Sequence, residues 1–236
     1  SGERKKISED EEKGKRKSTP MKSIFSKIML AQNTTQKTID RYYPPQTLSL
    51  GNEFFPLGKS ELPDDLAVHY KTLWVDFIGE VEKIKVMNDD AYFITLYHIL
   101  KKYTSFVPSA VWKSEPDISL FDHSKITCAI AECLHKNADE TYLNNIIAAM
   151  NKIFHNDNLT EDEESALNEE KFLLIGGDIS GVQKFIYSIT TKGAAKALKG
   201  RSFYLQLLGD AIAKYILKEL GLSVANLLYS AGGHFY

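Results

Sequence analysis

The fold of this chain is decided by three consecutive stretches: FLLIGGDISGVQKFIYSIT (residues 172–190), AAKALKGRSFYLQLLGDAIAKYILKEL (194–220) and ANLLYSAGGHFY (225–236). The first stretch opens with an apolar run at 172–175, which Gly176-Gly177 closes. A short apolar run bounded by glycines is typical of a buried strand. We therefore predict a strand at 172–175.

The other two stretches predict a crossover helix, a second strand and a hairpin. Apolar residues recur along one helical face from Arg201 onward, and Gly221 stands where a C-terminal capping glycine belongs. An apolar run at 226–229 predicts the second strand, and Gly232-Gly233 predicts the hairpin turn that follows it. Strand, helix, strand and turn in this order make the first half of a ferredoxin-like α+β unit.

Three segments within these stretches, GGDISGVQKFIY, AAKALKGRSFYLQLL and LLYSAGGHFY, also carry a family resemblance. In sequence and in order they resemble the first palm domain of the large subunit of type III-A CRISPR effector (Csm) complexes. In that family two palm domains face each other, and the second carries a Gly-Gly-Asp-Asp hairpin that joins ATP molecules into cyclic oligoadenylates. The resemblance implies that this chain is an internal fragment of such a protein, with ATP as a substrate.

The equivalent hairpin here reads Gly232-Gly233-His234 and lacks the pair of carboxylates. Metal-dependent nucleotidyl transfer needs carboxylates at that turn to hold Mg²⁺ on the phosphates. This palm therefore resembles the non-catalytic one, and we expect no catalytic residue in the chain. The residues expected to bind nucleotide are small or polar: Gly177, Asp178, Ser180, Gly181, Ser202, Gly232, Gly233 and His234.

Residues 176–181 (GGDISG) are expected to join a strand to a helix. Small residues let a phosphate approach the backbone, and the first amides of a helix favour an anion. Asp178 stands where cyclase-type palms place a metal-binding aspartate, although a helix-capping role fits the same residue. Ser202 could contact a nucleotide or cap the long helix. The neighbouring basic residues could contact phosphate or guide RNA, or remain solvated: Lys196, Lys199 and Arg201.

His123 lies in DISLFDHSKITCAIAECLH, a block that resembles part of the family's nuclease domain. That domain is a circularly permuted member of the His-Asp (HD) phosphohydrolase superfamily, in which a helix begins with a metal-binding histidine. The resemblance implies that His123 is a metal ligand and that metal-activated water cleaves single-stranded DNA. The implied ion is Mg or Mn, with Ni or Co as further candidates at the HD site. The residues alone equally fit a structural histidine, with Asp122 as a capping acid.

Composition limits the class of protein. With 236 residues, of which 43% are hydrophobic, the chain can bury a core in one or two domains. A net charge of −2 gives no argument for nucleic-acid binding. Two cysteines are too few for a disulfide framework and have no partners for a four-ligand zinc site, which suits a reducing cytoplasm. No apolar run approaches the roughly 20 residues of a membrane span, so we expect no membrane partner.

The predicted fold class is α+β: a helical, permuted HD-type domain followed by the first half of a ferredoxin-like palm domain. Apolar spacing predicts four helices, at 66–85, 89–103, 120–136 and 142–154. The expected segments are a charged disordered linker (1–20), a small β-rich connection (21–60), the helical part of the nuclease domain (61–155), an acidic linker (156–170) and the truncated first palm (171–236).

For the complete protein, the resemblance implies cleavage of single-stranded DNA and synthesis of cyclic oligoadenylate, both triggered by target RNA. The implied partners are the guide RNA, the target RNA and the other Csm subunits. The chain alone would be inactive, because it lacks both full sets of catalytic residues. Two alternatives stay open: a structural module that docks to other subunits, and a diguanylate-cyclase-like enzyme with an unrelated helical sensor. His234 argues against the second, which needs an acidic hairpin.

Overall fold

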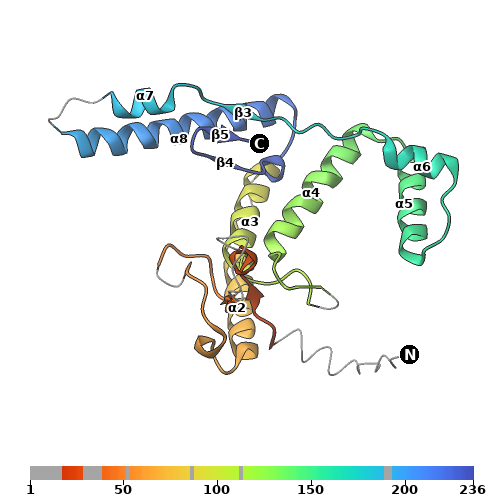
Figure 1. Cartoon of the computed structure of the whole chain (residues 1–236), viewed down its shortest axis with the longest axis horizontal. Coiled ribbons are helices and arrows are strands. Elements are labelled where there is room, and N and C mark those ends of the chain that lie inside the picture. The colour runs from red at the N-terminus through yellow and green to blue at the C-terminus, as the bar shows by residue number, and fades with distance from the viewer. Residues whose placement is uncertain (1–17, 29–38, 52–53, 86–87, 112–113, 189–192) are drawn as a thin grey trace, which may run out of the picture. The chain divides into compact units, whose positions relative to one another are not determined.

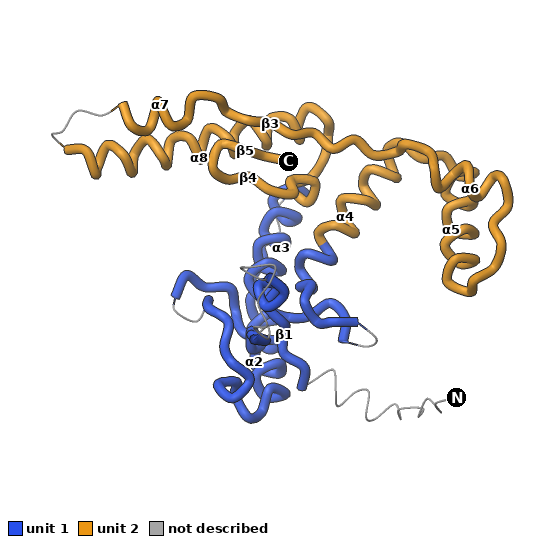
Figure 2. Tube along the Cα trace, viewed as in Figure 1, with its two compact units in different colours: residues 1–124 blue, residues 125–236 orange. Residues whose placement is uncertain are grey.

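The computed structural model describes residues 18–28, 39–51, 54–85, 88–111, 114–188 and 193–236. The chain divides into two compact units, residues 1–124 and 125–236, which Figure 2 colours separately. Helices with two small sheets confirm the α+β class. Most of the predicted charged linker, up to residue 17, lies outside the described residues.

Short strands and 3₁₀ turns precede the helices of the first unit (Figure 1). The elements up to the unit boundary are β1 (Met21–Lys22), η1 (Ile24–Lys27), β2 (Tyr42–Tyr43), η3 (Lys59–Glu61), α2 (Leu66–Val81) and α3 (Asp89–Thr104). Helix α4 (Leu120–Asn137) begins in the first unit and continues into the second. The second unit adds α5 (Glu140–His155), α6 (Glu161–Asn168), β3 (Gly177–Asp178), α7 (Val182–Tyr187), α8 (Ala194–Glu219), η4 (Val224–Asn226), β4 (Ser230–Ala231) and β5 (His234–Phe235).

The four predicted helices are confirmed as α2 to α5. Polar caps fix where two of them begin. The Asp65 carboxylate accepts from the amides of Ala67 and Val68 at the start of α2, and Asn88 accepts from the amide of Ala91 at the start of α3. None of the described helices is long and apolar enough to cross a membrane.

Aromatic packing supplies the core of the first unit. Phe77 of α2 meets Tyr103 of α3 edge to face, with ring centroids 5.9 Å apart, and Tyr103 is only 4% exposed. Tyr43 of β2 stacks on Phe106 at 4.8 Å. The Tyr70 hydroxyl donates to the Thr19 carbonyl at 2.7 Å, and burial raises the pKa of Tyr70 to about 12.

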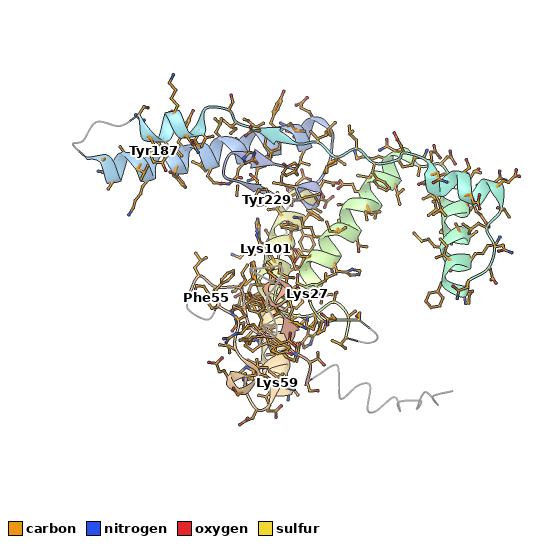
Figure 3. The ribbon with its side chains drawn as sticks, in the orientation of Figure 1. Lys27, Phe55, Lys59, Lys101, Tyr187 and Tyr229 are labelled. Atoms are coloured by element: carbon orange, nitrogen blue, oxygen red, sulfur yellow. The ribbon has the colours of Figure 1, made fainter. Side chains whose placement is uncertain are left out.

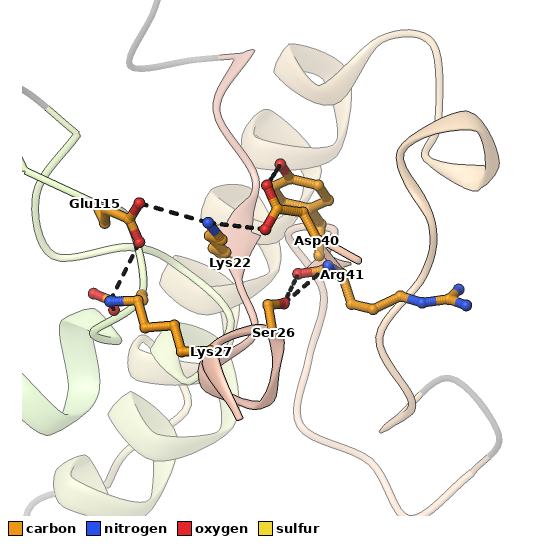
Figure 4. Close-up of polar contacts among 8 residues, drawn as sticks. Lys22, Ser26, Lys27, Asp40, Arg41 and Glu115 are labelled. Carbon is orange, nitrogen blue, oxygen red and sulfur yellow. Dashed lines mark hydrogen bonds and ion pairs between the residues drawn. The ribbon is translucent and has the colours of Figure 1, made fainter. Parts of the chain in front are cut away.

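An ion-pair network joins β1 and η1 to the loop before α4 (Figure 4). The Lys22 ammonium lies 3.0 Å from Asp40 and 3.5 Å from Glu115. Lys27 contacts Asp117 and lies 3.2 Å from Glu115. The hydrogen bond between Lys27 and Asp117 raises the pKa of Lys27 and lowers the pKa of Asp117. Because most of these groups are solvent-exposed, the network orients the connection more than it stabilises the unit.

Helices α5 and α6 pack on each other as a hairpin in the second unit. The segment predicted as an acidic linker therefore contains a folded helix. Thr160 and Glu163 form a capping box at its start, and the Glu163 carboxylate lies 2.8 Å from the Lys152 ammonium of α5. Ala166 of α6, 5% exposed, completes the contact. These interactions give the segment a buried face that its acidic composition conceals.

The last 60 residues form a three-stranded sheet beside α8. Its strand order is β3-β5-β4, and both pairings are antiparallel. The strand predicted at 172–175 is wrong in position, because the first strand is Gly177–Asp178. Gly177 pairs with Phe235 and Asp178 with His234. The apolar side chains of residues 172–175, which precede this strand, are 39–84% exposed.

The crossover helix is longer than predicted and ends as predicted. It begins at Ala194 rather than near Arg201, because the intervening residues are strong helix formers apart from Gly200. At its other end Gly221 (φ 62) adopts the left-handed conformation. The Gly221 amide donates to the Lys218 carbonyl and the Leu222 amide to the Leu217 carbonyl, at 3.0 and 2.8 Å. This pair of bonds is the Schellman motif.

The second strand also lies later than predicted. Asn226 is the last residue of the 3₁₀ turn η4, residues 227–229 follow it, and the strand itself is Ser230–Ala231. The Tyr236 amide still donates to the Tyr229 carbonyl at 2.9 Å, so the pairing extends past the short strand. The predicted hairpin turn at Gly232-Gly233 is confirmed.

The α5–α6 hairpin should lose stability in acid because of Glu163. The pKa of the Glu163 carboxyl group is lowered mainly by the hydrogen bond from Lys152, and further by the hydrogen bond from the Thr160 amide. When folding lowers the pKa of a carboxyl group, its contribution to stability is complete at a pH above the pKa of the unfolded state. That contribution is lost as the pH falls through the pKa of the folded state. Between about pH 5 and about pH 3, the thermal midpoint of the chain should fall less in Glu163→Gln than in the wild type.

Glu164→Gln is the matched control, because Glu164 is an exposed neighbour with the same charge. It should keep the wild-type pH dependence in circular-dichroism melts. Identical pH dependence in Glu163→Gln and Glu164→Gln would contradict the assignment.

Candidate functional site

The hairpin between β4 and β5 places two glycines at its turn. Gly232 and Gly233 have φ values of 65° and 89°, as a two-residue type I′ turn requires. The Gly233 carbonyl accepts from the Ile179 amide at 2.8 Å. A Cβ on Gly233 would lie 3.0 Å from Val182 Cγ2, whereas a Cβ on Gly232 would meet nothing within 4 Å. Gly232 is therefore the open apex of the turn, and Gly233 packs against the start of α7.

Asp178 and His234 lie opposite each other on neighbouring strands. The carboxylate Oδ1 of Asp178 is 3.1 Å from Nδ1 of His234, and the two side chains are 63% and 53% exposed. The pair is fully ionic only when the imidazole is protonated. Asp178 and His234, which the sequence predicts as separate nucleotide-binding residues, thus form one polar pair beside the open turn.

Gly177 has a packing role. A Cβ there would lie 2.0 Å from the nearest atom of the Phe235 ring, so the glycine makes room for that ring against the sheet. Gly181 (φ 76) is the N-cap residue of α7, with no atom within 4 Å of a Cβ built on it. Ser180, between these two glycines, is exposed. The strand-to-helix junction predicted at 176–181 is confirmed as a junction.

Ser202 lies on α8, on a polar stripe with two residues that sequence reasoning missed. Ser202, Gln206 and Asp210 are spaced four residues apart and so share one helical face. Gln206 and Asp210 bind Ser230, the first residue of β4. The signal in the sequence was two polar residues at helical spacing within residues 203–213, whose other members are apolar or glycine.

The basic cluster at the start of α8 is partly engaged in structure. The Arg201 guanidinium donates to the carbonyls of Phe185 and Ser188 at 2.5 and 2.9 Å. It also lies 5.2 Å from the Phe185 ring centroid. Arg201 thus satisfies carbonyl groups at the end of α7. Tyr187, the last residue of α7, is labelled in Figure 3.

His123 lies in the first turns of α4, on an exposed part of the helix. The His123 amide donates to the Ser119 carbonyl at 3.0 Å. The Ser119 hydroxyl accepts from the Asp122 amide and donates to its carboxylate, at 2.9 and 2.7 Å. Ser119 therefore caps the helix, and Asp122 is a first-turn acid that bonds this cap.

The described residues do not complete a metal site. Among them, no three His, Cys, Asp or Glu side chains are close enough to hold an ion together. His123 offers one imidazole, and the sheet offers one carboxylate, that of Asp178 on β3, which is paired with His234. Mg²⁺ prefers several oxygen ligands. These residues therefore do not fit a metal without ligands from elsewhere.

Comparison with known proteins defines the class of this sheet and its helix. Residues 171–236 match the family model described as Csm1 subunit domain B. The chain is also similar to two proteins named "CRISPR system single-strand-specific deoxyribonuclease Cas10/Csm1 (subtype III-A)". The Methanocaldococcus jannaschii protein is 44% identical, with 71% of this chain and 22% of that protein covered. The Mycobacterium tuberculosis protein is 40% identical, with 66% and 19% covered.

Solved structures extend the similarity to nearly the whole chain. A Csm1–Csm4 cassette in complex with pppApApA has a TM-score of 0.61 and 30% identity, over 92% of this chain and 25% of that chain. The Csm1 structure from T. onnurineus has a TM-score of 0.58 and 32% identity, with the same coverage. The chain is thus homologous, over most of its length, to one part of the Cas10/Csm1 large subunit of subtype III-A. It spans about a fifth of the curated relatives it matches.

Gly177→Ala should destabilise the sheet, because the new methyl group would overlap the Phe235 ring. The expected loss is roughly 1–3 kcal/mol in the free energy of unfolding, measured by urea denaturation of the chain. Gly200→Ala is the matched control: Gly200 lies inside α8 with no atom within 4 Å of a Cβ built on it. It should stabilise the chain by up to about 1 kcal/mol. A Gly177→Ala chain as stable as the wild type would mean that Phe235 does not pack there.

Proposed function

We propose that this chain is part of the large subunit of a type III-A CRISPR effector. In the complete protein, that subunit would cleave single-stranded DNA and synthesise cyclic oligoadenylate from ATP when target RNA binds. The match of residues 171–236 to Csm1 subunit domain B carries the proposal. The relatives' names supply the deoxyribonuclease activity. Similar structures hold pppApApA and cA4, a linear and a cyclic oligoadenylate, which support the synthase activity.

We assign residues 171–236 to the first half of a palm domain. The pairing order β3-β5-β4 supports this assignment, because the third strand of a ferredoxin-like unit lies between its first two strands. We assign residues 61–155 to the helical part of a permuted HD nuclease domain, with His123 as one metal ligand. The alternative of a diguanylate-cyclase-like enzyme lacks support, because the turn here carries His234 where that chemistry needs carboxylates.

In oligoadenylate synthesis, a ribose hydroxyl of one ATP attacks the α-phosphate of the next, and pyrophosphate leaves. The rate of such a step depends strongly on aligning donor and acceptor. This palm would supply alignment, and the facing palm would supply the ligands for Mg²⁺ or Mn²⁺. Gly232 leaves open space at the apex of the turn for a nucleotide. His234, oriented by Asp178, would stack on a base or donate a hydrogen bond.

The partners of the complete subunit would be the guide RNA, the target RNA, single-stranded DNA and other Csm subunits. The Csm1–Csm4 cassettes among the similar structures support another Csm subunit as a partner of the complete protein, and a docking role for this chain stays as the alternative. The chain alone would synthesise no oligoadenylate and cleave no DNA, because its described residues complete no metal site.

Gly232→Asn in the complete effector tests the nucleotide-binding turn. Asparagine tolerates the left-handed conformation of Gly232, and Asn-Gly is a favoured type I′ turn, so the hairpin should still fold. Its side chain would fill the open space at the apex. We expect oligoadenylate synthesis at saturating target RNA to fall roughly tenfold or more, with assembly and DNA cleavage unchanged.

Gly221→Asn is the matched control, because Gly221 also has a positive φ and ends α8 away from the turn. Its synthesis should equal that of the wild type. Gly233→Val is less informative, since its Cβ would press on Val182 and disturb the fold. Wild-type synthesis by an assembled Gly232→Asn complex would mean that the hairpin is only a turn.

His123→Ala in the complete protein tests the nuclease assignment. If His123 is a metal ligand, metal-dependent DNA cleavage should fall by about tenfold or more while oligoadenylate synthesis stays near the wild-type rate. His135→Ala is the control, because His135 is exposed on the same helix. Normal cleavage by His123→Ala would assign His123 a structural role.

A further inference from the structure

Two side chains of α8 fasten the strand that leads into the hairpin. The Ser230 hydroxyl donates to Asp210 Oδ1 at 2.6 Å. The Gln206 amide donates to the Ser230 carbonyl at 3.2 Å and to the same Asp210 oxygen at 3.0 Å. Gln206, Asp210 and Ser230 form a closed set of hydrogen bonds, which we call the α8 clamp. All three bonds lie in a partly buried region, where hydrogen bonds are less weakened by water.

The clamp is possible because α8 approaches the sheet closely. Its buried face presents Leu205, Gly209 and Ala213, again four residues apart. A Cβ on Gly209 would lie 3.9 Å from Ile179 Cδ1 and 4.0 Å from Ser230 Oγ. Small residues on this face bring the helix near β4, and the neighbouring polar stripe then reaches Ser230.

The clamp also fixes the register of β4. This strand has only two residues, so its ladder to β5 contributes few hydrogen bonds. The clamp holds both the hydroxyl and the carbonyl of Ser230. A slip of β4 by one residue would bring Ala231, which has no hydroxyl, to Asp210, and would turn the side chains of β4 to the other face of the sheet.

We propose that Gln206 and Asp210 are positioning residues that hold Gly232 and His234 in place for the nucleotide. The inference rests on the proposed function of the hairpin. Neither residue touches the turn itself. They act through Ser230, two residues before Gly232, and the turn then follows from the register of β4 and β5.

A second anchor on the same segment provides a control. The Glu132 carboxylate of α4 accepts from the Ser223 amide at 3.0 Å, from the Ser223 hydroxyl at 2.8 Å and from the Asn226 side chain at 2.5 Å. These bonds fix η4, at the end of the segment away from the turn. Loss of this anchor removes a comparable number of hydrogen bonds without releasing Ser230.

The experiment compares Ser230→Ala, Ser230→Thr and Glu132→Gln in the assembled effector. Hydrogen–deuterium exchange of peptides covering 227–236 reports the hairpin, and initial rates at varied ATP report KM and kcat. Ser230→Ala should speed exchange and raise the KM for ATP roughly tenfold. Ser230→Thr, which keeps the hydroxyl, should restore both. Glu132→Gln should lower thermal stability and leave the KM unchanged.

The outcomes separate this inference from the proposed function. Reduced synthesis by Gly232→Asn together with an unchanged KM in Ser230→Ala would overturn the positioning role alone. Full synthesis in both variants would overturn the nucleotide-binding role of the hairpin as well. An equal rise in KM in Glu132→Gln would mean that the α8 clamp contributes only to general stability and does not position the turn. Failure of Ser230→Thr to restore the KM would lead to the same conclusion.

Discussion

The C-terminal sheet depends on one contact, the packing of the Phe235 ring over Gly177. Antiparallel pairing sets these residues opposite each other, and only the absence of a side chain at Gly177 leaves room for the ring. Once this pair is in place, the next pair in the register joins Asp178 to His234. The polar pair therefore follows from a steric requirement rather than from any attraction between the polar groups, whose exposed contact is weak.

The site assembled in this way has shape and hydrogen-bonding capacity but little charge. The Asp178 carboxylate faces the His234 imidazole beside the open turn. Helix α8 holds the adjoining strand β4 through hydrogen bonds to Ser230. Such an arrangement suits a surface that aligns a nucleotide for chemistry carried out by other groups. It supports our proposal that one palm supplies the metal ligands and this one supplies geometry.

Much of this architecture could be predicted from the sequence. Apolar spacing indicates α2 to α5, Gly221 marks the end of α8, and Gly232-Gly233 marks the hairpin. The positions of the two strands could not be predicted, since pairing register depends on partners distant in sequence. Helix α6 was missed because its acidic composition conceals a capping box and a buried face. Asp178 and His234 were each predicted, but their contact required the register.

The exposed run at 172–175 has a consequence for how the chain behaves in solution. Strand β3 lies at the edge of the sheet, and this run leads directly into it with four large apolar side chains in water. Unpaired backbone next to apolar side chains is a template for a further extended segment. Charged residues are the usual protection of such an edge, and none occurs between Lys171 and Asp178. In the purified 236-residue chain, this edge of the sheet is therefore prone to pair with an extended segment of another molecule. Self-association of the chain should increase with its concentration.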